Sequence, residues 1–126
     1  MCANNAETVI NNYYEALRQG DELAVFFAPD DSLVKFGISE QLTGYEEVAD
    51  GLGEQTRHSK EWKITSHDLQ VTERDDHAWF SDTVDMAWTD TTTGIRRSFN
   101  SRWSGTLEDR DGWKIVGMHV SAPHTL

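Results

Sequence analysis

Three polar side chains near the C-terminal end of the chain have residue types and spacing suited to one site. Arg102 precedes the turn-forming stretch Asp109-Arg110-Asp111-Gly112, and His119 and Ser121 follow it. Because so short a turn makes its flanking strands antiparallel neighbours, we expect the three side chains to lie close together. A guanidinium can bind a carboxylate in a bidentate way, and an imidazole can donate to a carbonyl or shuttle a proton.

A fourth candidate is a carboxylate within an apolar strand face. Asp82 alternates in phase with apolar residues on both sides, namely Ala78, Phe80, Val84, Met86 and Trp88. A charged side chain at such a position needs either a partner of opposite charge or a role in binding or catalysis. We therefore consider proton abstraction next to a carbonyl, with Asp82 or His119 as the base and Arg102 or a tyrosine stabilising the oxyanion. The alternative is a buried ion pair between Asp82 and Arg102 that only fixes the strand register.

Aromatic residues offer further candidates for lining a pocket. Tyr13 and Tyr14 lie on the apolar face of the first expected helix, although aromatic residues at helical spacing are first of all core residues. Trp88 shares the face of Asp82 and is a candidate for ligand contact. The pattern does not separate core, pocket wall and dimer contact for the tryptophans.

The first half of the chain is expected to be mainly helical. Apolar residues at helical spacing predict a first helix over residues 6–19, and a short second helix should end before Pro29. Thr43 and Glu46 have the spacing of a capping box, which predicts a third helix over residues 44–57.

The second half follows a period of two, which is typical of strands. A short strand at 32–36 and a weaker one before residue 43 are expected earlier; turns then separate long strands at 62–72, 78–89, 96–108 and 113–122. Short loops make these strands an antiparallel meander, and long strands curl into a concave face. The sequence therefore predicts one α+β domain over residues 1–126. Three N-terminal helices should pack on a strongly curved, mainly antiparallel sheet, with a pocket between them.

Composition narrows the expected partners and cofactors. The net charge of −11 argues against nucleic acid and anionic membrane as partners. No apolar run approaches the roughly 18 residues needed to span a bilayer, and the N-terminus does not resemble a secretory signal, so we expect a cytoplasmic protein.

There is no P-loop, dinucleotide fingerprint or CxxC, and the five histidines lack metal-ligand spacing, so we expect no cofactor and no metal. The single cysteine, Cys2, is assigned no role.

Several stretches resemble the SnoaL-like branch of the nuclear transport factor 2-like (NTF2-like) superfamily. They are Leu42-Thr43-Gly44-Tyr45-Glu46, Ala78-Trp79-Phe80, the run from Arg102 to Val116, and Met118-His119-Val120-Ser121. The C-terminal half also resembles the association domain of calmodulin-dependent kinase II. The resemblance implies a cone-shaped fold in which His119 points at the cavity, Arg102 lines it, and one tyrosine of the first helix lies nearby.

The resemblance also implies a homodimer formed through the convex face of the sheet. We expect Val116, Met118 and Val120 to lie opposite Trp113 and Ile115, so that both faces of the last strand carry bulky apolar residues.

The function expected from these residues is binding of a small organic molecule that carries a carboxylate or a carbonyl. Arg102 and His119 would engage that group, and the reaction would be proton abstraction or isomerisation. Because this fold also carries binding and assembly domains, the alternative is a non-enzymatic ligand-binding or dimerisation module.

Overall fold

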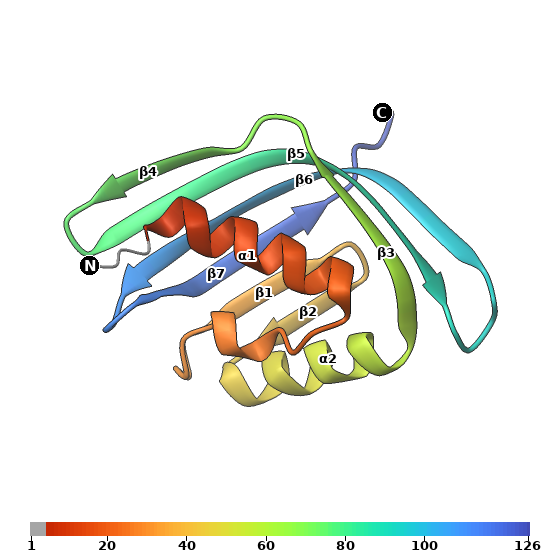
Figure 1. Cartoon of the computed structure of the whole chain (residues 1–126), viewed down its shortest axis with the longest axis horizontal. Coiled ribbons are helices and arrows are strands. Elements are labelled where there is room, and N and C mark those ends of the chain that lie inside the picture. The colour runs from red at the N-terminus through yellow and green to blue at the C-terminus, as the bar shows by residue number, and fades with distance from the viewer. Residues whose placement is uncertain (1–4) are drawn as a thin grey trace.

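The computed structural model describes residues 5–126, so Cys2 lies outside the described residues. The described chain forms two α-helices and one curved sheet of seven strands, with the helices on the concave side (Figure 1). The expected α+β architecture is confirmed, but one of the three expected helices is not an α-helix. Neither described helix is long and apolar enough to cross a membrane.

The first helix, α1, spans Ala6–Gln19 as its apolar spacing predicts. The side chain of Asn5 caps its start by accepting a hydrogen bond of 2.8 Å from the backbone N–H of Thr8. Gly20 ends the helix with a φ of 71°, a left-handed conformation that glycine adopts at little steric cost.

The second expected helix is only a single 3₁₀ turn, η1, at Ala24–Phe26. Phe27 is already extended and forms an isolated parallel bridge with Ile115. The backbone N–H of Ala28 then donates to the carbonyl of Ile115 at 2.9 Å. Pairing with the sheet therefore ends the helical conformation before a second α-helical turn forms.

The other helix, α2, spans Tyr45–Arg57 and begins differently from the expected capping box. Its N-cap, Gly44, makes no side-chain capping bond. Glu47, rather than Glu46, reaches back and accepts a hydrogen bond of 3.0 Å from the backbone N–H of Thr43. The carboxylate that bonds to the backbone N–H of Thr43 thus comes from Glu47, one residue later than in a capping box.

The sheet has the strand order β2-β1-β7-β6-β5-β3, with β4 also paired to β5. Only the β1–β7 pair is parallel among the described strand pairs. The expected strand at 62–72 is two strands, because the chain bends at residues 67–69 and each part pairs with a different half of β5. The bounds are Val34–Gly37 (β1), Glu40–Thr43 (β2), Ser59–Ser66 (β3), Gln70–Arg74 (β4), His77–Asp90 (β5), Arg96–Asp109 (β6) and Trp113–Ser121 (β7).

A bulge in β7 decides which of its side chains reach the core. Leu107 pairs with Ile115, whereas Thr106 pairs with Gly117, so Val116 is an extra residue in β7. The extra residue shifts the alternation of faces. The bulky residues before and after it are all buried: Trp113, Ile115, Met118 and Val120. The expectation that these residues lie on opposite faces is therefore wrong.

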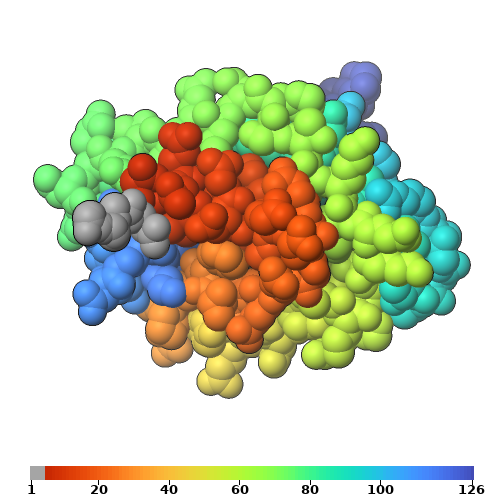
Figure 2. Space-filling model, in the orientation of Figure 1, coloured from red at the N-terminus to blue at the C-terminus, as the bar shows by residue number. Residues whose placement is uncertain are grey.

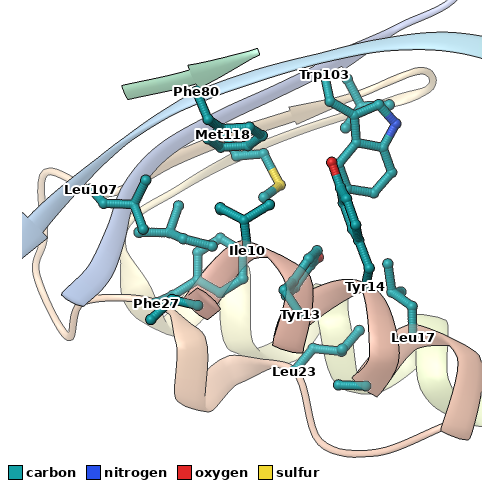
Figure 3. Close-up of a cluster of buried hydrophobic side chains, with 14 of the residues drawn as sticks. Ile10, Tyr13, Tyr14, Leu17, Leu23, Phe27, Phe80, Trp103, Leu107 and Met118 are labelled. Carbon is teal, nitrogen blue, oxygen red and sulfur yellow. The ribbon is translucent and has the colours of Figure 1, made fainter. Parts of the chain in front are cut away.

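The core lies between α1 and the concave face of the sheet. Figure 3 shows Ile10, Tyr13 and Tyr14 pointing from α1 toward the strands. The ring of Tyr14 meets that of Trp103 edge to face, with 5.5 Å between their centroids. In Figure 2 the red atoms of α1 lie in the middle of the visible face below the green strands, and the orange segment that contains η1 lies between them and the yellow start of α2. The helix thus covers the inner side of the sheet.

Gly105 in β6 provides a test of this packing. A Cβ at Gly105 would lie 2.5 Å from the carbonyl oxygen of Gly117 and 2.7 Å from a ring carbon of Phe80. We expect Gly105→Ala to lower the free energy of unfolding by about 1–3 kcal/mol, because the strand backbone or the ring must shift. Urea denaturation measures this. Gly117→Ala is the matched control, since a Cβ there meets nothing within 4 Å; equal losses in the two variants would contradict the packing described.

Candidate functional site

A cavity of about 710 Å³ lies between α1, the β1–β2 hairpin, the end of α2 and the concave face of the sheet. This volume is within the range of roughly 300–1,000 Å³ typical of sites for small organic ligands. Its apolar and aromatic lining consists of Tyr13, Leu17, Ile38, Trp62, Met86, Trp88, Phe99, Trp103, Met118 and Val120. Two of the residues that the sequence suggests for ligand contact, Tyr13 and Trp88, are among them.

Three aromatic rings from neighbouring strands form one wall of the cavity. The rings of Trp62 and Trp88 stack with centroids 4.8 Å apart and planes 16° from parallel. Phe99 continues the stack at 5.7 Å from Trp88. All three side chains belong to half-buried residues, so part of each ring remains free for contact with a guest molecule. The wall favours an aromatic or otherwise conjugated guest.

A bulge in β3 brings Trp62 into this wall. The register with β5 shifts around Glu61, whose φ of 56° is uncommon for a residue other than glycine. Arg96 donates to the carbonyl of Glu61 at 2.6 Å, and the indole N–H of Trp62 donates to the hydroxyl of Ser59 at 2.8 Å. These two hydrogen bonds support the bulge and orient the indole.

An ion pair in the β1–β2 hairpin forms one polar part of the cavity, which His58, Asp90 and Arg97 also line. The Lys35 side chain is 7% exposed and donates through Nζ to Oε1 of Glu40, whose side chain is 33% exposed. Both residues line the cavity. Gly37 makes room for the acid, because a Cβ at this position would lie 2.8 Å from Cγ of Glu40. An ammonium and a carboxylate therefore meet at the edge of a largely apolar space.

Tyr13 is a further residue with a polar group that lines this cavity. Tyr13 is buried, and its ring meets the rings of Phe26 and Phe27 edge to face. Burial, followed by the negative charge of Glu40, raises the pKa of the hydroxyl, so that it is protonated at neutral pH and able to donate. No hydrogen bond of this hydroxyl is found within residues 5–126, and Tyr13 lines the cavity, so the donor is available to a guest there.

Asp82 is held by hydrogen bonds on the helix side of the sheet. It is 5% exposed, and its Oδ2 accepts from the hydroxyl of Tyr14 at 2.8 Å and from the hydroxyl of Ser66 at 2.6 Å. Its Oδ1 accepts from the backbone N–H of Asp68 at 2.9 Å. Burial and the hydrogen bond to Asp82 raise the pKa of the Tyr14 hydroxyl. The carboxylate thus joins α1 to β5 and to the bend between β3 and β4.

Arg102, His119 and Ser121 lie together on the outer, convex face. Arg102 is paired in register with Ser121, and Ser104 with His119. These residues line a depression of about 360 Å³, together with Thr83 and other polar residues. They do not line the large cavity.

Asp82 lines the same depression as Arg102 and His119, so a shared site stays a prediction, but its side chain projects to the other face of the sheet. Asp82 is paired in register with Trp103, and Thr83 with Arg102, so Asp82 and Arg102 project to opposite faces. Both carboxylate oxygens of Asp82 accept hydrogen bonds from the donors described above. The alternative of an Asp82–Arg102 ion pair is absent among the described residues, in which Arg102 has no acidic partner.

The sequence model of the SnoaL-like domain matches residues 6–125. The chain belongs to the SnoaL-like domain family. No curated protein matches its sequence significantly.

Solved structures show which fold this SnoaL-like domain has. A candidate dehydratase of the NTF2-like family from Streptomyces avermitilis is 18% identical, with 94% of each chain covered and a TM-score of 0.82. A candidate calcium/calmodulin-dependent protein kinase II association domain from Xanthomonas campestris is 21% identical (95% of this chain, 86% of that one, TM-score 0.77). A ketosteroid isomerase-like protein from Erwinia carotovora atroseptica is 15% identical (94% of each chain, TM-score 0.76). At these identities the likeness concerns the fold alone, and the expected NTF2-like fold is confirmed.

Sequence reasoning missed the ion pair of this SnoaL-like domain. A signal for Lys35 was present, because it alternates in phase with Leu33, which is fully buried. Nothing local points to Glu40, whose approach to Lys35 depends on the turn of the hairpin. No group of three or more His, Cys, Asp or Glu residues within the described chain is arranged to hold a metal ion.

The two adjacent tyrosines of α1 allow a direct test of these roles. We expect Tyr14→Phe to lower the free energy of unfolding by about 1–3 kcal/mol, because the buried carboxylate of Asp82 loses one of its donors. Tyr13→Phe, which removes a hydroxyl without a partner in the described chain, should cost less than about 0.5 kcal/mol. Guanidinium denaturation at neutral pH measures both values. A Tyr13→Phe loss as large as that of Tyr14→Phe would contradict the assignment.

Proposed function

We propose that this SnoaL-like domain binds a small organic molecule that carries a carboxylate or a carbonyl group in the cavity beside α1. The observation that supports it most is a buried ammonium, that of Lys35, in a cavity that Tyr13 also lines and whose surface is more apolar than polar. The ammonium and the Tyr13 hydroxyl are hydrogen-bond donors suited to carboxylate or carbonyl oxygen. A concave apolar site with few polar groups is typical of small-molecule binding.

The apolar part of the ligand would contact the wall formed by Trp62, Trp88 and Phe99. The fold is also that of a ketosteroid isomerase-like protein and of a candidate dehydratase, which supports a pocket of this kind. Proton abstraction by Asp82 or His119 remains a prediction from the sequence. Neither residue lines the cavity, so its geometry adds no support to that reaction.

Binding can be tested with 2-naphthoate and its neutral counterpart 2-naphthamide by isothermal titration calorimetry. We expect Trp88→Ala to weaken binding of both probes, because each loses contact with the aromatic wall. Lys35→Met should weaken binding of 2-naphthoate by about tenfold or more, because it removes the charged donor and keeps a side chain of similar length. 2-Naphthamide should be affected less.

Arg102→Ala is the matched control, since it removes a cation from the opposite face of the sheet. Its binding of both probes should equal that of the unaltered protein. Absence of binding by the unaltered protein, or loss of 2-naphthoate binding in Arg102→Ala but not in Lys35→Met, would overturn the proposal.

We also propose that the domain forms a homodimer through the convex face of the sheet. This face carries the exposed rings of Trp79 (48% exposed) and Phe36 (37%) beside the depression that contains Arg102 and His119. Structural similarity to a candidate association domain supports self-association.

The dimer can be tested by sedimentation equilibrium. The unaltered protein should have about twice the monomer mass of 14.3 kDa. Arg102→Glu should shift the equilibrium toward monomer, because it places an added negative charge twice in a symmetric interface of a chain with net charge −11. Arg57→Glu, on the exposed side of α2, changes the charge equally and should leave the mass unchanged. A monomeric unaltered protein would contradict the dimer.

Two expectations about cellular context stay predictions. They are the cytoplasmic location and the absence of nucleic-acid and membrane partners. The excess of acidic residues supports the second, because phosphate groups would be repelled.

A further inference from the structure

We propose that the carboxylate of Glu40 occupies the position that a ligand's acid group takes, and that an incoming monocarboxylate displaces it from Lys35. This inference rests on the proposed function and narrows its ligand class to aromatic or conjugated monocarboxylates. Glu40 is then an internal competitor that sets affinity and selectivity at the cavity.

The two partners of the ion pair differ in their access to solvent. Lys35 projects from β1 into the protein, and with 7% of its side chain exposed its ammonium needs an anion beside it. The Glu40 side chain is 33% exposed and belongs to the first residue of β2, next to the hairpin turn. Glu40 can therefore turn toward water and keep its charge solvated, whereas Lys35 cannot.

The hairpin is shaped to admit the acid into this position. Gly37 pairs in register with Glu40, and a Cβ on Gly37 would lie 2.8 Å from Cγ and 2.9 Å from Oε1 of Glu40. The glycine thus leaves the space that the inward side chain of Glu40 uses. An outward rotation of Glu40 would leave its place beside Lys35 to another carboxylate.

The exchange preserves charge balance at the buried end of the site. Before it, Lys35 is neutralised by Glu40; after it, Lys35 is neutralised by the ligand while Glu40 faces water. Tyr13 lines the same cavity, and no hydrogen bond of its hydroxyl is found in the described chain, so it is a further donor for the ligand. A neutral ligand gains nothing from this exchange, because it cannot replace the charge of Glu40. Glu40 therefore lowers the affinity for every ligand that must displace it, and for no other.

The experiment compares Glu40→Gln with the unaltered protein by isothermal titration calorimetry. We expect Glu40→Gln to bind 2-naphthoate about tenfold more tightly, because the internal competitor is gone, and to bind 2-naphthamide within about twofold of the unaltered protein. Glu46→Gln, in the exposed first turn of α2, makes the same change in net charge and should alter neither affinity.

A second variant tests the role of Glu40 without leaving the Lys35 ammonium unpaired. Glu40→Asp keeps the charge but shortens the side chain by one methylene group, and we expect a smaller gain in affinity for 2-naphthoate. Circular dichroism checks that each variant is folded. The rise in melting temperature caused by 2-naphthoate should be larger for Glu40→Gln than for the unaltered protein.

The outcomes separate this inference from the proposed function. If the unaltered protein binds both probes and Glu40→Gln binds 2-naphthoate equally or more weakly, the competitor role of Glu40 is overturned and the ligand-binding function stands. If neither protein binds either probe, both proposals fail. An equal gain in Glu46→Gln would show that only net charge matters, which also overturns the role of Glu40.

Discussion

The buried carboxylate of Asp82 constrains how the helix lies on the sheet. A charge with 5% exposure is stable only when its oxygens are hydrogen-bonded, and its donors come from Tyr14 on α1, Ser66 at the end of β3 and Asp68 in the following bend. Moving any of these segments would break a hydrogen bond to a buried anion. The position of α1 and the break between β3 and β4 are therefore set by the same group.

This anchoring also orients the candidate site. Successive residues of an α-helix point about 100° apart, so when Tyr14 points to Asp82, Tyr13 points elsewhere, to the rings of Phe26 and Phe27 at the cavity. The two adjacent tyrosines therefore point to different parts of the inner face of the sheet. At one end, the hydrogen bonds of Asp82 join α1 to the sheet. At the other end lies the cavity that Tyr13 lines.

Local patterns in the sequence predict most elements but not the site. The bounds of α1 follow from helical spacing and Gly20, and alternation correctly places Asp82 with the apolar residues of its strand and Arg102 opposite those of its own. Since the apolar faces of paired strands lie on one side of a sheet, that alternation already separates the two charges. The family resemblance implies that Arg102 and His119 line the pocket, whereas neither of them lines the large cavity. The extra residue Val116 has no signature in a pattern of period two, so the faces of β7 required the observed register.

The buried lysine is better explained by recognition than by stability. Exchange of a buried ion pair for apolar side chains of similar size is often neutral or stabilising, so the Lys35–Glu40 pair is not required to hold β1 and β2 together. A leucine or methionine at position 35 would line the same cavity without a charge. A cation retained there makes the cavity less favourable for purely apolar molecules and more favourable for an oxygen anion. In the proposed function the pair would give the ligand a preferred orientation, with its charged end toward the hairpin and its conjugated part toward Trp88, two parts of the same cavity.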